Sequence, residues 1–194
     1  MKTLLGEQKL QRLVTYVRLS NHIEGSIAEI GVYKGGSAMS IARNKREDKR
    51  LFLFDTFDGL PQECEKDNHH KKGDFADTSL ESVREGLKNF DNVYIHKGLF
   101  PHETGTAIWN EVFSLVHIDV DLYKSYVDTL NFIWSRVVKG GIVVMDDYNA
   151  STCLGAKLAV DEFFYDKREA LIWSCMSQIC AVKGSEAHIP FRML

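Results

Sequence analysis

Short, almost wholly apolar runs alternate along this chain with segments of helical periodicity, and no other feature constrains the fold as strongly. Strands of this kind have no polar face, so both of their sides must be buried. Helices that connect successive strands can cover both faces of a parallel sheet. The expected fold is therefore α/β, with a mostly parallel, doubly wound sheet.

The boundaries follow from the same pattern. Leu10, Leu13, Val14 and Val17 fall on one helical face, so a first helix within residues 1–25 should cover a sheet edge or a ligand pocket. Strands are expected at 26–30, 51–54, 93–96, 113–118 and 142–145, and further helices at 37–45, 79–89, 126–138 and 156–168. Strands at 170–174 and 179–183 lie too close for a crossover helix, so a C-terminal antiparallel hairpin is expected.

Composition limits the classes of protein to consider. The 194 residues are 44% hydrophobic with a formal net charge of -3, which suits a single domain over 1–194 that folds without disulfide or metal staples. No apolar run has the roughly 20 residues of a membrane span, and the N-terminus has no signal-peptide core. A cytoplasmic protein with no membrane partner is expected, and its four cysteines, which form no CxxC pair, are expected to be free thiols.

The charge pattern also argues against nucleic acid as a partner. Basic pairs such as Lys45-Arg46 and Lys49-Arg50 are interrupted by Glu47 and Asp48, so no positive stripe is available for a phosphate backbone. A small molecule is the expected ligand.

One connection, residues 56–78, is far longer than the roughly four to six residues that are usual in such domains. Long loops of this kind are commonly functional, so we interpret it as a lid over the carboxyl ends of the strands. The alternative is a solvated insertion without a role. His69 and His70 within it can touch substrate or metal, although adjacent histidines beside Lys71 and Lys72 are usually solvated.

Polar residues that could bind this ligand follow the first two strands. Gly31, Gly35 and Gly36 allow a tight turn after the first strand, and the helix that opens near Ser37 offers free amide donors to an anion. Asp55, at the end of the second strand, is placed to accept hydrogen bonds from ribose hydroxyls. Together these features predict an adenosine-containing ligand.

Three more carboxylates follow the fourth and fifth strands: Asp119, and the pair Asp146 and Asp147. Carboxylates at neighbouring strand ends repel one another unless they share a cation. Ligand sets made only of oxygen favour Mg²⁺ or a similar hard ion over zinc. These three residues are the predicted metal ligands.

Nearby residues have simpler interpretations. Asp121 is expected to begin the following helix, where an acid favours the helix dipole, and is not assigned to the metal. His117 lies inside an apolar strand and is expected to be a satisfied sheet histidine. Tyr123 and Tyr148, each just after an acidic cluster, are expected to form pocket walls.

Six stretches in order, at 27–43 (IAEIGVYKGGSAMSIAR), 51–61 (LFLFDTFDGLP), 73–83 (GDFADTSLESV), 96–101 (HKGLFP), 117–125 (HIDVDLYKS) and 140–149 (GGIVVMDDYN), resemble one family. It is the macrocin O-methyltransferase family of class I S-adenosylmethionine-dependent methyltransferases, which methylate sugar hydroxyls on natural products. The first stretch also resembles the catechol-type O-methyltransferases. The resemblance implies a Rossmann-like class I methyltransferase fold, and it is compatible with a homo-oligomer.

The resemblance also implies roles for individual residues. Gly31 and Ser37 would hold the methionine part of S-adenosylmethionine, Glu29 would support its amino end, and Tyr33 belongs to the same cofactor-binding turn. Asp55 would bind the ribose. Asp119, Asp146 and Asp147 match the family's metal-binding carboxylates, and Asp119 also matches the proposed catalytic base.

Two other functions stay open at this point. A nicotinamide-dependent oxidoreductase would explain the first βαβ unit and Asp55, but not the three metal-type carboxylates. A non-catalytic module that binds an adenosine ligand would keep Asp55 and the glycines and could dispense with those carboxylates. Among methyl acceptors, a sugar follows from resemblance alone, and a catechol, a sugar nucleotide or a cell-envelope glycan would satisfy the same metal chemistry.

Overall fold

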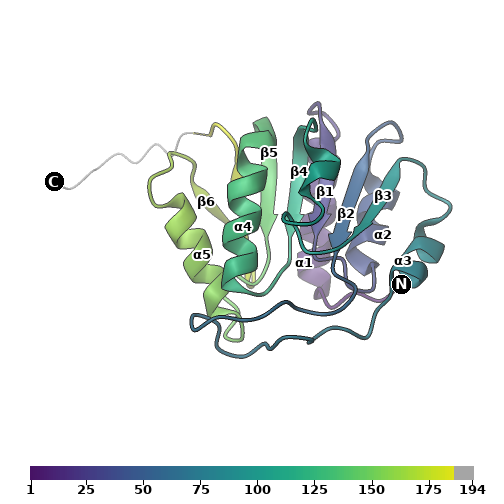
Figure 1. Cartoon of the computed structure of the whole chain (residues 1–194). Helices are drawn as coiled ribbons and strands as arrows, with labels where there is room; N and C mark the ends of the chain where they lie inside the picture. Colours follow the sequence, from purple (N-terminus) through teal and green to yellow (C-terminus); the bar gives the residue numbers. More distant parts are fainter. Residues whose placement is uncertain (186–194) are drawn as a thin grey trace.

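A computed structural model describes residues 1–185, which form a seven-stranded sheet with helices on both faces (Figure 1). The predicted single domain runs to Leu194, so its part at 186–194 lies outside the described residues. The strand order is β3-β2-β1-β4-β5-β7-β6. The strands are β1 (Ser26–Ile30), β2 (Leu51–Asp55), β3 (Val93–Lys97), β4 (Phe113–Ile118), β5 (Val137–Met145), β6 (Leu171–Cys175) and β7 (Gln178–Val182).

The predicted topology is confirmed. Strands β1 to β5 pair in parallel, whereas β7 pairs antiparallel with both β5 and β6. Because β1 has β2 on one side and β4 on the other, the strand order reverses at β1. In doubly wound sheets the crevice at this reversal, at the carboxyl ends of the strands, is where ligands bind.

The helices form one layer on each side of the sheet. On one face lie α1 (Glu7–Ser20), α2 (Gly36–Asn44) and α3 (Leu80–Leu87), and on the other α4 (Tyr123–Ile133) and α5 (Leu154–Phe164) (Figure 1). Two short 3-10 helices, η1 (Gly105–Ile108) and η2 (Trp134–Arg136), complete the described elements. Each layer buries its own cluster of apolar side chains against the sheet, around Leu13 and Ile41 on the first face and around Tyr126 and Val160 on the second. No helix of the described residues is both long and apolar enough to cross a membrane.

The largest differences from the predicted element boundaries are in α4, β5 and α5, which runs over Leu154–Phe164 in place of 156–168. Helix α4 begins at Tyr123, three residues early, because the Asp67 carboxylate accepts the Tyr123 amide hydrogen at 2.8 Å. This partner lies 56 residues away and leaves no local signal. Strand β5 begins at Val137, inside the predicted helix, because Val137 already pairs with Phe113 of β4.

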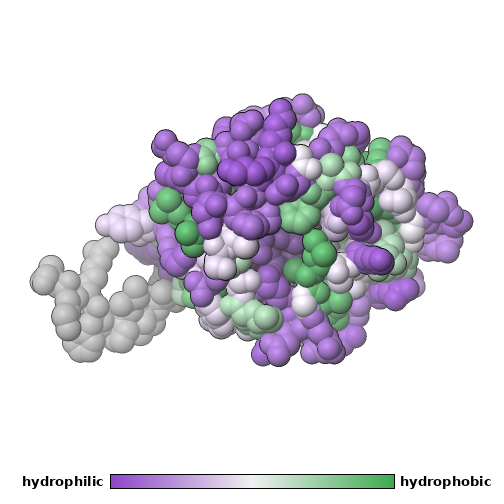
Figure 2. Space-filling model, turned by 90° about the horizontal axis from the view of Figure 1, so that it is seen from below, coloured by the Kyte–Doolittle hydropathy of each residue, from purple (hydrophilic) through white to green (hydrophobic). Residues whose placement is uncertain are grey.

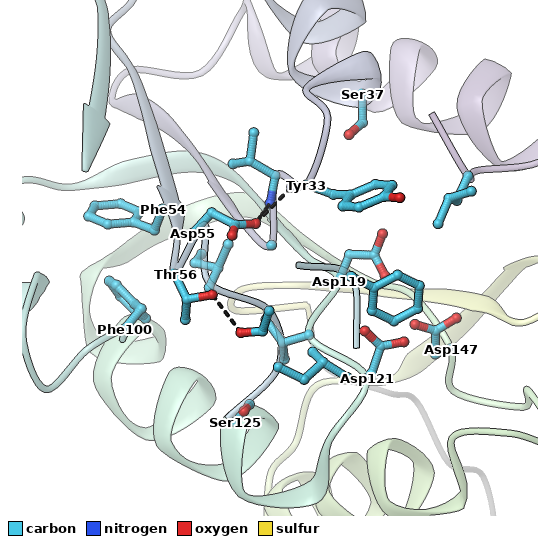
Figure 3. A pocket seen from close by; sticks show the side chains of 18 of the residues that line it. Tyr33, Ser37, Phe54, Asp55, Thr56, Phe100, Asp119, Asp121, Ser125 and Asp147 are labelled. Carbon is cyan, nitrogen blue, oxygen red and sulfur yellow. Dashed lines mark hydrogen bonds between the residues drawn. The ribbon is translucent and has the colours of Figure 1, made fainter. Parts of the chain in front are cut away.

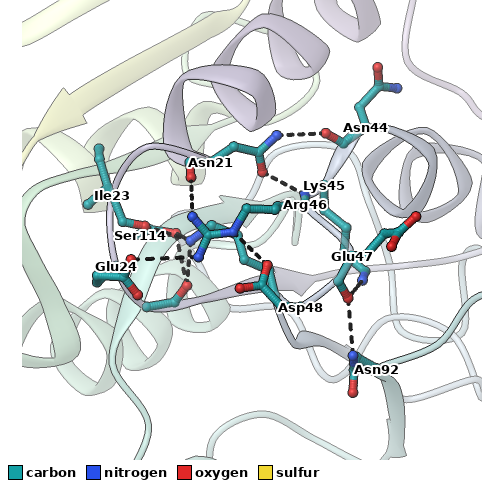
Figure 4. A network of polar contacts seen from close by, with 12 residues as sticks. Asn21, Ile23, Glu24, Asn44, Lys45, Arg46, Glu47, Asp48, Asn92 and Ser114 are labelled. Carbon is teal, nitrogen blue, oxygen red and sulfur yellow. Dashed lines mark hydrogen bonds and ion pairs between the residues drawn. The ribbon is translucent and has the colours of Figure 1, made fainter.

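The edge of the sheet at the amino ends of its strands is held by polar contacts between connections (Figure 4). The Lys49 ammonium is buried and donates to the carbonyls of Ile23 and Gly25 at 2.6 and 2.7 Å and to the Ser114 hydroxyl at 2.9 Å. Arg46 donates from its backbone amide and its guanidinium to Asn21. These bonds fix the starts of β1 and β2, which lead to the opposite edge.

The long connection after β2 runs across that opposite edge, below the carboxyl ends of the strands, to the start of α5 and back to α3 (Figure 1). Asp67 binds the first amide of α4, and Asn68 accepts the Leu154 amide hydrogen at the start of α5. At its other end Thr78 donates to the Tyr33 carbonyl at 2.6 Å. The loop is thus anchored to both halves of the sheet, and its role as a lid stays a prediction.

Candidate functional site

A cavity of about 250 Å³ opens at the carboxyl ends of β1, β2, β4 and β5. Its walls come from the strand ends, the N-terminal segment with Lys9 of α1, and the long loop, which contributes Thr56, Gly59, Leu60, Pro61, His70 and Phe75. Seen from below, hydrophobic side chains gather near the middle of this face within a hydrophilic rim (Figure 2). The loop therefore forms a wall of the predicted ligand crevice.

Gly31 and Asp55 shape one side of this cavity. Figure 3 shows Asp55 beside Phe54 and Thr56 on this side. Gly31 has φ +89°, and a Cβ there would lie 1.8 Å from the carbonyl oxygen of Asp119, so only glycine allows β1 and β4 to end side by side. The Asp55 carboxylate accepts backbone N–H bonds from Val32 at 2.8 Å, Tyr33 at 2.7 Å and Phe57 at 2.7 Å. A carboxylate has about four acceptor positions, so Asp55 keeps about one for a ligand hydroxyl.

The start of α2 faces the same space. Gly35, which directly precedes α2, has a left-handed backbone conformation with φ +76°. Within the described chain, no side chain accepts a hydrogen bond from the first amides of α2. The Ser37 hydroxyl and the Tyr33 ring line the cavity next to these amides. Free amides at a helix N-terminus bind carboxylates and phosphates well.

An apolar wall that the sequence did not point out lies beside Asp55. Phe54 and Phe100 pack with their ring centroids 4.7 Å apart, and Gly98 and Leu99 continue this wall from the end of β3. A flat aromatic ligand group next to Asp55 would find an apolar surface here. A signal for this wall existed in the HKGLFP stretch, residues 96–101, which begins at the last residue of the predicted strand 93–96 and so leads to the carboxyl edge of the sheet.

Four acidic residues occupy the other side of the cavity. Asp119, Asp121 and Asp147 line it, and Asp146 lies just behind them in the sheet. Burial and repulsion from Asp147 and Asp146 raise the pKa of Asp119 well above its usual range. Burial and repulsion from Asp147 also raise the pKa of Asp121 to about 7.

Asp146 is fully buried and carries three polar partners. Its Oδ2 accepts from His117 Nε2 at 2.9 Å and from Gln178 Nε2 at 3.0 Å, while the Lys9 ammonium lies 2.6 Å from its Oδ1. Burial alone would raise the pKa of Asp146, but His117 and Lys9 hold it below its usual range. His117 also binds Glu29 at 2.9 Å, and these two carboxylates raise its pKa to about 9 although burial opposes this.

This donor set suits a hard divalent cation. Asp119 and Asp147 supply carboxylate oxygens that face the cavity, and such oxygens are the ligands that hard divalent cations prefer. His117, Asp119 and Asp146 also offer ligand atoms within 4.8 Å of one another. A cation on Asp146 Oδ1, however, would have to displace the Lys9 ammonium, which also lies 3.5 Å from Asp147.

Comparison with known proteins gives the family. A family model described as macrocin O-methyltransferase (TylF) matches residues 1–179. This chain belongs to the macrocin O-methyltransferase family. It is 29% identical to a demethyldecarbamoylnovobiocin O-methyltransferase of Streptomyces niveus over 83% of this chain and 67% of the relative. It is 27% identical to a mycinamicin III 3''-O-methyltransferase of Micromonospora griseorubida over 78% of this chain and 66% of the relative.

Solved structures agree with this membership. The O-methyltransferase NovP superposes with a TM-score of 0.80 at 26% identity, covering 93% of this chain and 81% of that one. The calicheamicin methyltransferase CalS11 shares the fold, with a TM-score of 0.76 at 20% identity, covering 91% of this chain and 79% of that one. The chain spans about two thirds of the length of the curated relatives above. The Rossmann-like methyltransferase fold is thereby confirmed.

Among the residues predicted for this family member, Gly31, Tyr33, Ser37, Asp55, Asp119 and Asp147 all line the one cavity. Glu29 lies in the sheet with its side chain on His117, outside the cavity lining, so its predicted support of the cofactor's amino end stays a prediction. The interpretation of His117 as a satisfied sheet histidine is confirmed, because both of its ring nitrogens bind carboxylates.

Other predictions were wrong. Asp121 does not begin a helix, since α4 starts at Tyr123, and Asp121 has φ +55° and faces the cavity. Tyr123 and Tyr148 are not cavity walls, because their hydroxyls turn to Glu162 and Asp161 of α5, each at 2.6 Å.

Lys9 was missed although a signal existed. It precedes Leu13 and Val17 by four and eight residues, which places it on the buried face of α1. A lysine on an apolar helix face needs a buried acid as its partner.

Proposed function

We propose that this protein transfers a methyl group from S-adenosylmethionine to a hydroxyl group of a sugar or glycosylated small molecule, with help from a divalent cation. The observation that carries the proposal is the cavity itself. Its one side has the glycine turn, the open start of α2 and Asp55, and its other side has the cavity-facing carboxylates Asp119 and Asp147. A curated relative from Streptomyces olivaceus, whose name describes O-methylation of a rhamnosyl-tetracenomycin, supports the acceptor class.

The first side supports binding of the methyl donor. The free amides and the Ser37 hydroxyl at the start of α2 suit its carboxylate. Asp55, with about one acceptor position left, suits one ribose hydroxyl, and the wall of Phe54 and Phe100 suits the adenine ring. A solved O-methyltransferase of Bacillus cereus in complex with SAH shares this fold, with a TM-score of 0.65 at 17% identity.

The second side supports activation of the acceptor. Asp119 and Asp147 would hold a cation such as Mg²⁺, and when bound this ion lowers the pKa of a coordinated hydroxyl. Asp119 borders the same space and would accept the proton that the hydroxyl releases. Asp146 contributes indirectly, since it fixes Lys9, which lines the cavity, and His117, which lies behind it.

The remaining contribution is geometric. Methyl transfer needs the attacking oxygen in line with the sulfonium methyl, and holding both reactants in one cavity supplies most of the acceleration. The loop residues Leu60, Pro61 and Phe75 add apolar surface to the cavity and limit access of water.

The test is a methyl-transfer assay read by mass spectrometry. Purified protein, S-adenosylmethionine and Mg²⁺ are incubated with panels of sugar nucleotides, glycosylated metabolites and catechols. A mass gain of one methylene on a sugar hydroxyl supports the proposal, and its loss in Asp119→Asn would support a role of Asp119 in the reaction, as cation ligand or as base. Transfer to catechols alone would contradict the proposed acceptor class. Binding of the donor without transfer to any panel member, whichever divalent metal is added, would instead indicate a non-catalytic binding protein.

A further inference from the structure

Three side chains of different chemistry meet at the rim of the cavity, apart from the Asp119 and Asp147 pair. They are His70 of the long loop, Asp121 after β4 and Cys153 just before α5. Each offers one ligand atom, and these atoms all lie within 4.8 Å of one another. We propose that His70, Asp121 and Cys153 form a second cation site, which takes a borderline transition-metal ion such as Zn²⁺ or Co²⁺ and fastens the loop over the cavity.

The separations of the ligand atoms fit one metal ion. Cys153 Sγ lies 3.6 Å from Asp121 Oδ1, and His70 Nε2 lies 3.7 Å from the same oxygen. In a tetrahedral zinc site, bonds of about 2.3 Å to sulfur and about 2.0 Å to nitrogen and oxygen separate the ligand atoms by roughly 3.3 to 3.5 Å. The His70–Asp121 separation is too long for a direct hydrogen bond. The third pair of ligand atoms, on His70 and Cys153, lies within 4.8 Å, so the three side chains must draw closer around an ion to complete the site.

The His70 ring is already oriented for this role. Its Nδ1 lies 3.4 Å from Asp74 Oδ2, so a carboxylate stands behind the ring while Nε2 points to Asp121. Metal-binding histidines commonly donate their second ring nitrogen to a carboxylate in this way. The Phe75 ring packs against His70 with centroids 5.3 Å apart and limits its rotation.

The chemistry of the set differs from that of the cluster around Asp119. A thiolate and an imidazole prefer softer ions such as Zn²⁺, whereas a site made only of carboxylates prefers hard ions such as Mg²⁺. The two sites would therefore bind different metals. Cys153 is 4% exposed and free of disulfides, and its thiol would lose its proton to solvent when the metal binds. All three ligands line the cavity, which leaves a further position on the ion for water or for an acceptor oxygen.

The site would have a structural consequence. His70 belongs to the long loop of about two dozen residues. Asp121 follows the end of β4, and Cys153 directly precedes α5. A metal ion bound by all three would hold this loop closed over the cavity.

The test is titration of the full chain with Co²⁺, followed by displacement with Zn²⁺. We expect a near-ultraviolet thiolate-to-cobalt charge-transfer band that saturates at one ion per chain, and its loss in Cys153→Ser and in His70→Ala. His69→Ala and Cys64→Ser are matched controls, since His69 is exposed and neither residue lines the cavity, and they should keep the band. Asp119→Asn should keep it as well, which makes this result independent of methyl transfer.

A second readout follows the loop. Lys71 and Lys72 are exposed next to His70, so trypsin can report loop opening. At about 100 times the dissociation constant, Zn²⁺ should slow cleavage at these lysines about 100-fold in the wild type and not in His70→Ala. Absence of the band in the wild type, or a band that survives both ligand variants, would overturn the proposal. So would a band that only Asp119→Asn removes.

Discussion

The Lys9 ammonium is the most informative side chain to remove, because it neutralises a buried carboxylate at the back of the cavity. In Lys9→Met the side chain keeps its length and apolar stem but loses its charge. Asp146 is fully buried and would retain only His117 and Gln178. Removing one partner of a fully buried ion pair costs about 3–5 kcal/mol, and a single hydrogen bond to a charged group contributes about 1.5–3 kcal/mol.

Because two of the three Asp146 partners remain, the lower figure applies, and we expect Lys9→Met to lose about 2–3 kcal/mol of unfolding free energy. For a chain of this size that loss lowers the melting temperature by roughly 5–10 °C. The assay is urea and thermal unfolding at pH 7 with EDTA. Lys124→Met is the matched control, because Lys124 pairs with Asp128 at the surface and its loss should change little.

Metal dependence gives the same variant a second outcome. With Lys9 gone, Asp146 Oδ1 is open to a cation, so Mg²⁺ should stabilise Lys9→Met more than it stabilises the wild type. A Lys9→Met protein as stable as Lys124→Met would refute the ion-pair reasoning. Equal stabilisation of variant and wild type by Mg²⁺ would show that Lys9 and the cation do not share Asp146.

Three further predictions concern single residues. Asp55→Asn should weaken binding of S-adenosylhomocysteine by about 1–3 kcal/mol, measured by calorimetry, because the carboxylate holds the glycine turn and, in the proposed complex, would bind a ribose hydroxyl; an unchanged affinity would contradict this. The pKa of His117 in the folded protein is about 9, above its usual 6.5. The charged His117 therefore stabilises the folded state fully below pH 6.5, and this stabilisation, about 3 kcal/mol, is lost as the pH rises through 9. Unfolding in EDTA between pH 6 and 10 should show this slope in the wild type and not in His117→Gln. Gly31→Ala should prevent folding or strongly lower the melting temperature, because its Cβ would overlap the Asp119 carbonyl; a protein that melts like the wild type would show that this turn can rearrange.

The sheet was predictable because its signals are local. Each β-strand from Ser26–Ile30 to Gln178–Val182 is apolar enough to be recognised from its own residues, and a parallel sheet then fixes which strand ends share an edge. This is why Asp55, Asp119 and Asp147, far apart in the sequence, could be assigned to one cavity.

The parts that could not be predicted depend on distant partners. Asp67 sets the start of α4 from the long loop, and Asp146 is withdrawn from the cavity by Lys9 of α1 and Gln178 of β7. Asp121 was misjudged because dipole arguments favour an acid at a helix start, whereas its backbone turn directs it to the cavity. Roles of this kind follow from tertiary packing and not from spacing.

The central claim is that one cavity binds an S-adenosyl ligand on its glycine side and a divalent cation on its acidic side. Calorimetric titration with S-adenosylhomocysteine, run once with Mg²⁺ and once with EDTA and repeated with NAD, tests this most directly. The account predicts micromolar binding of S-adenosylhomocysteine in both runs, a separate heat for Mg²⁺ that Asp147→Asn removes, and no binding of NAD. Binding of NAD without binding of S-adenosylhomocysteine would contradict it.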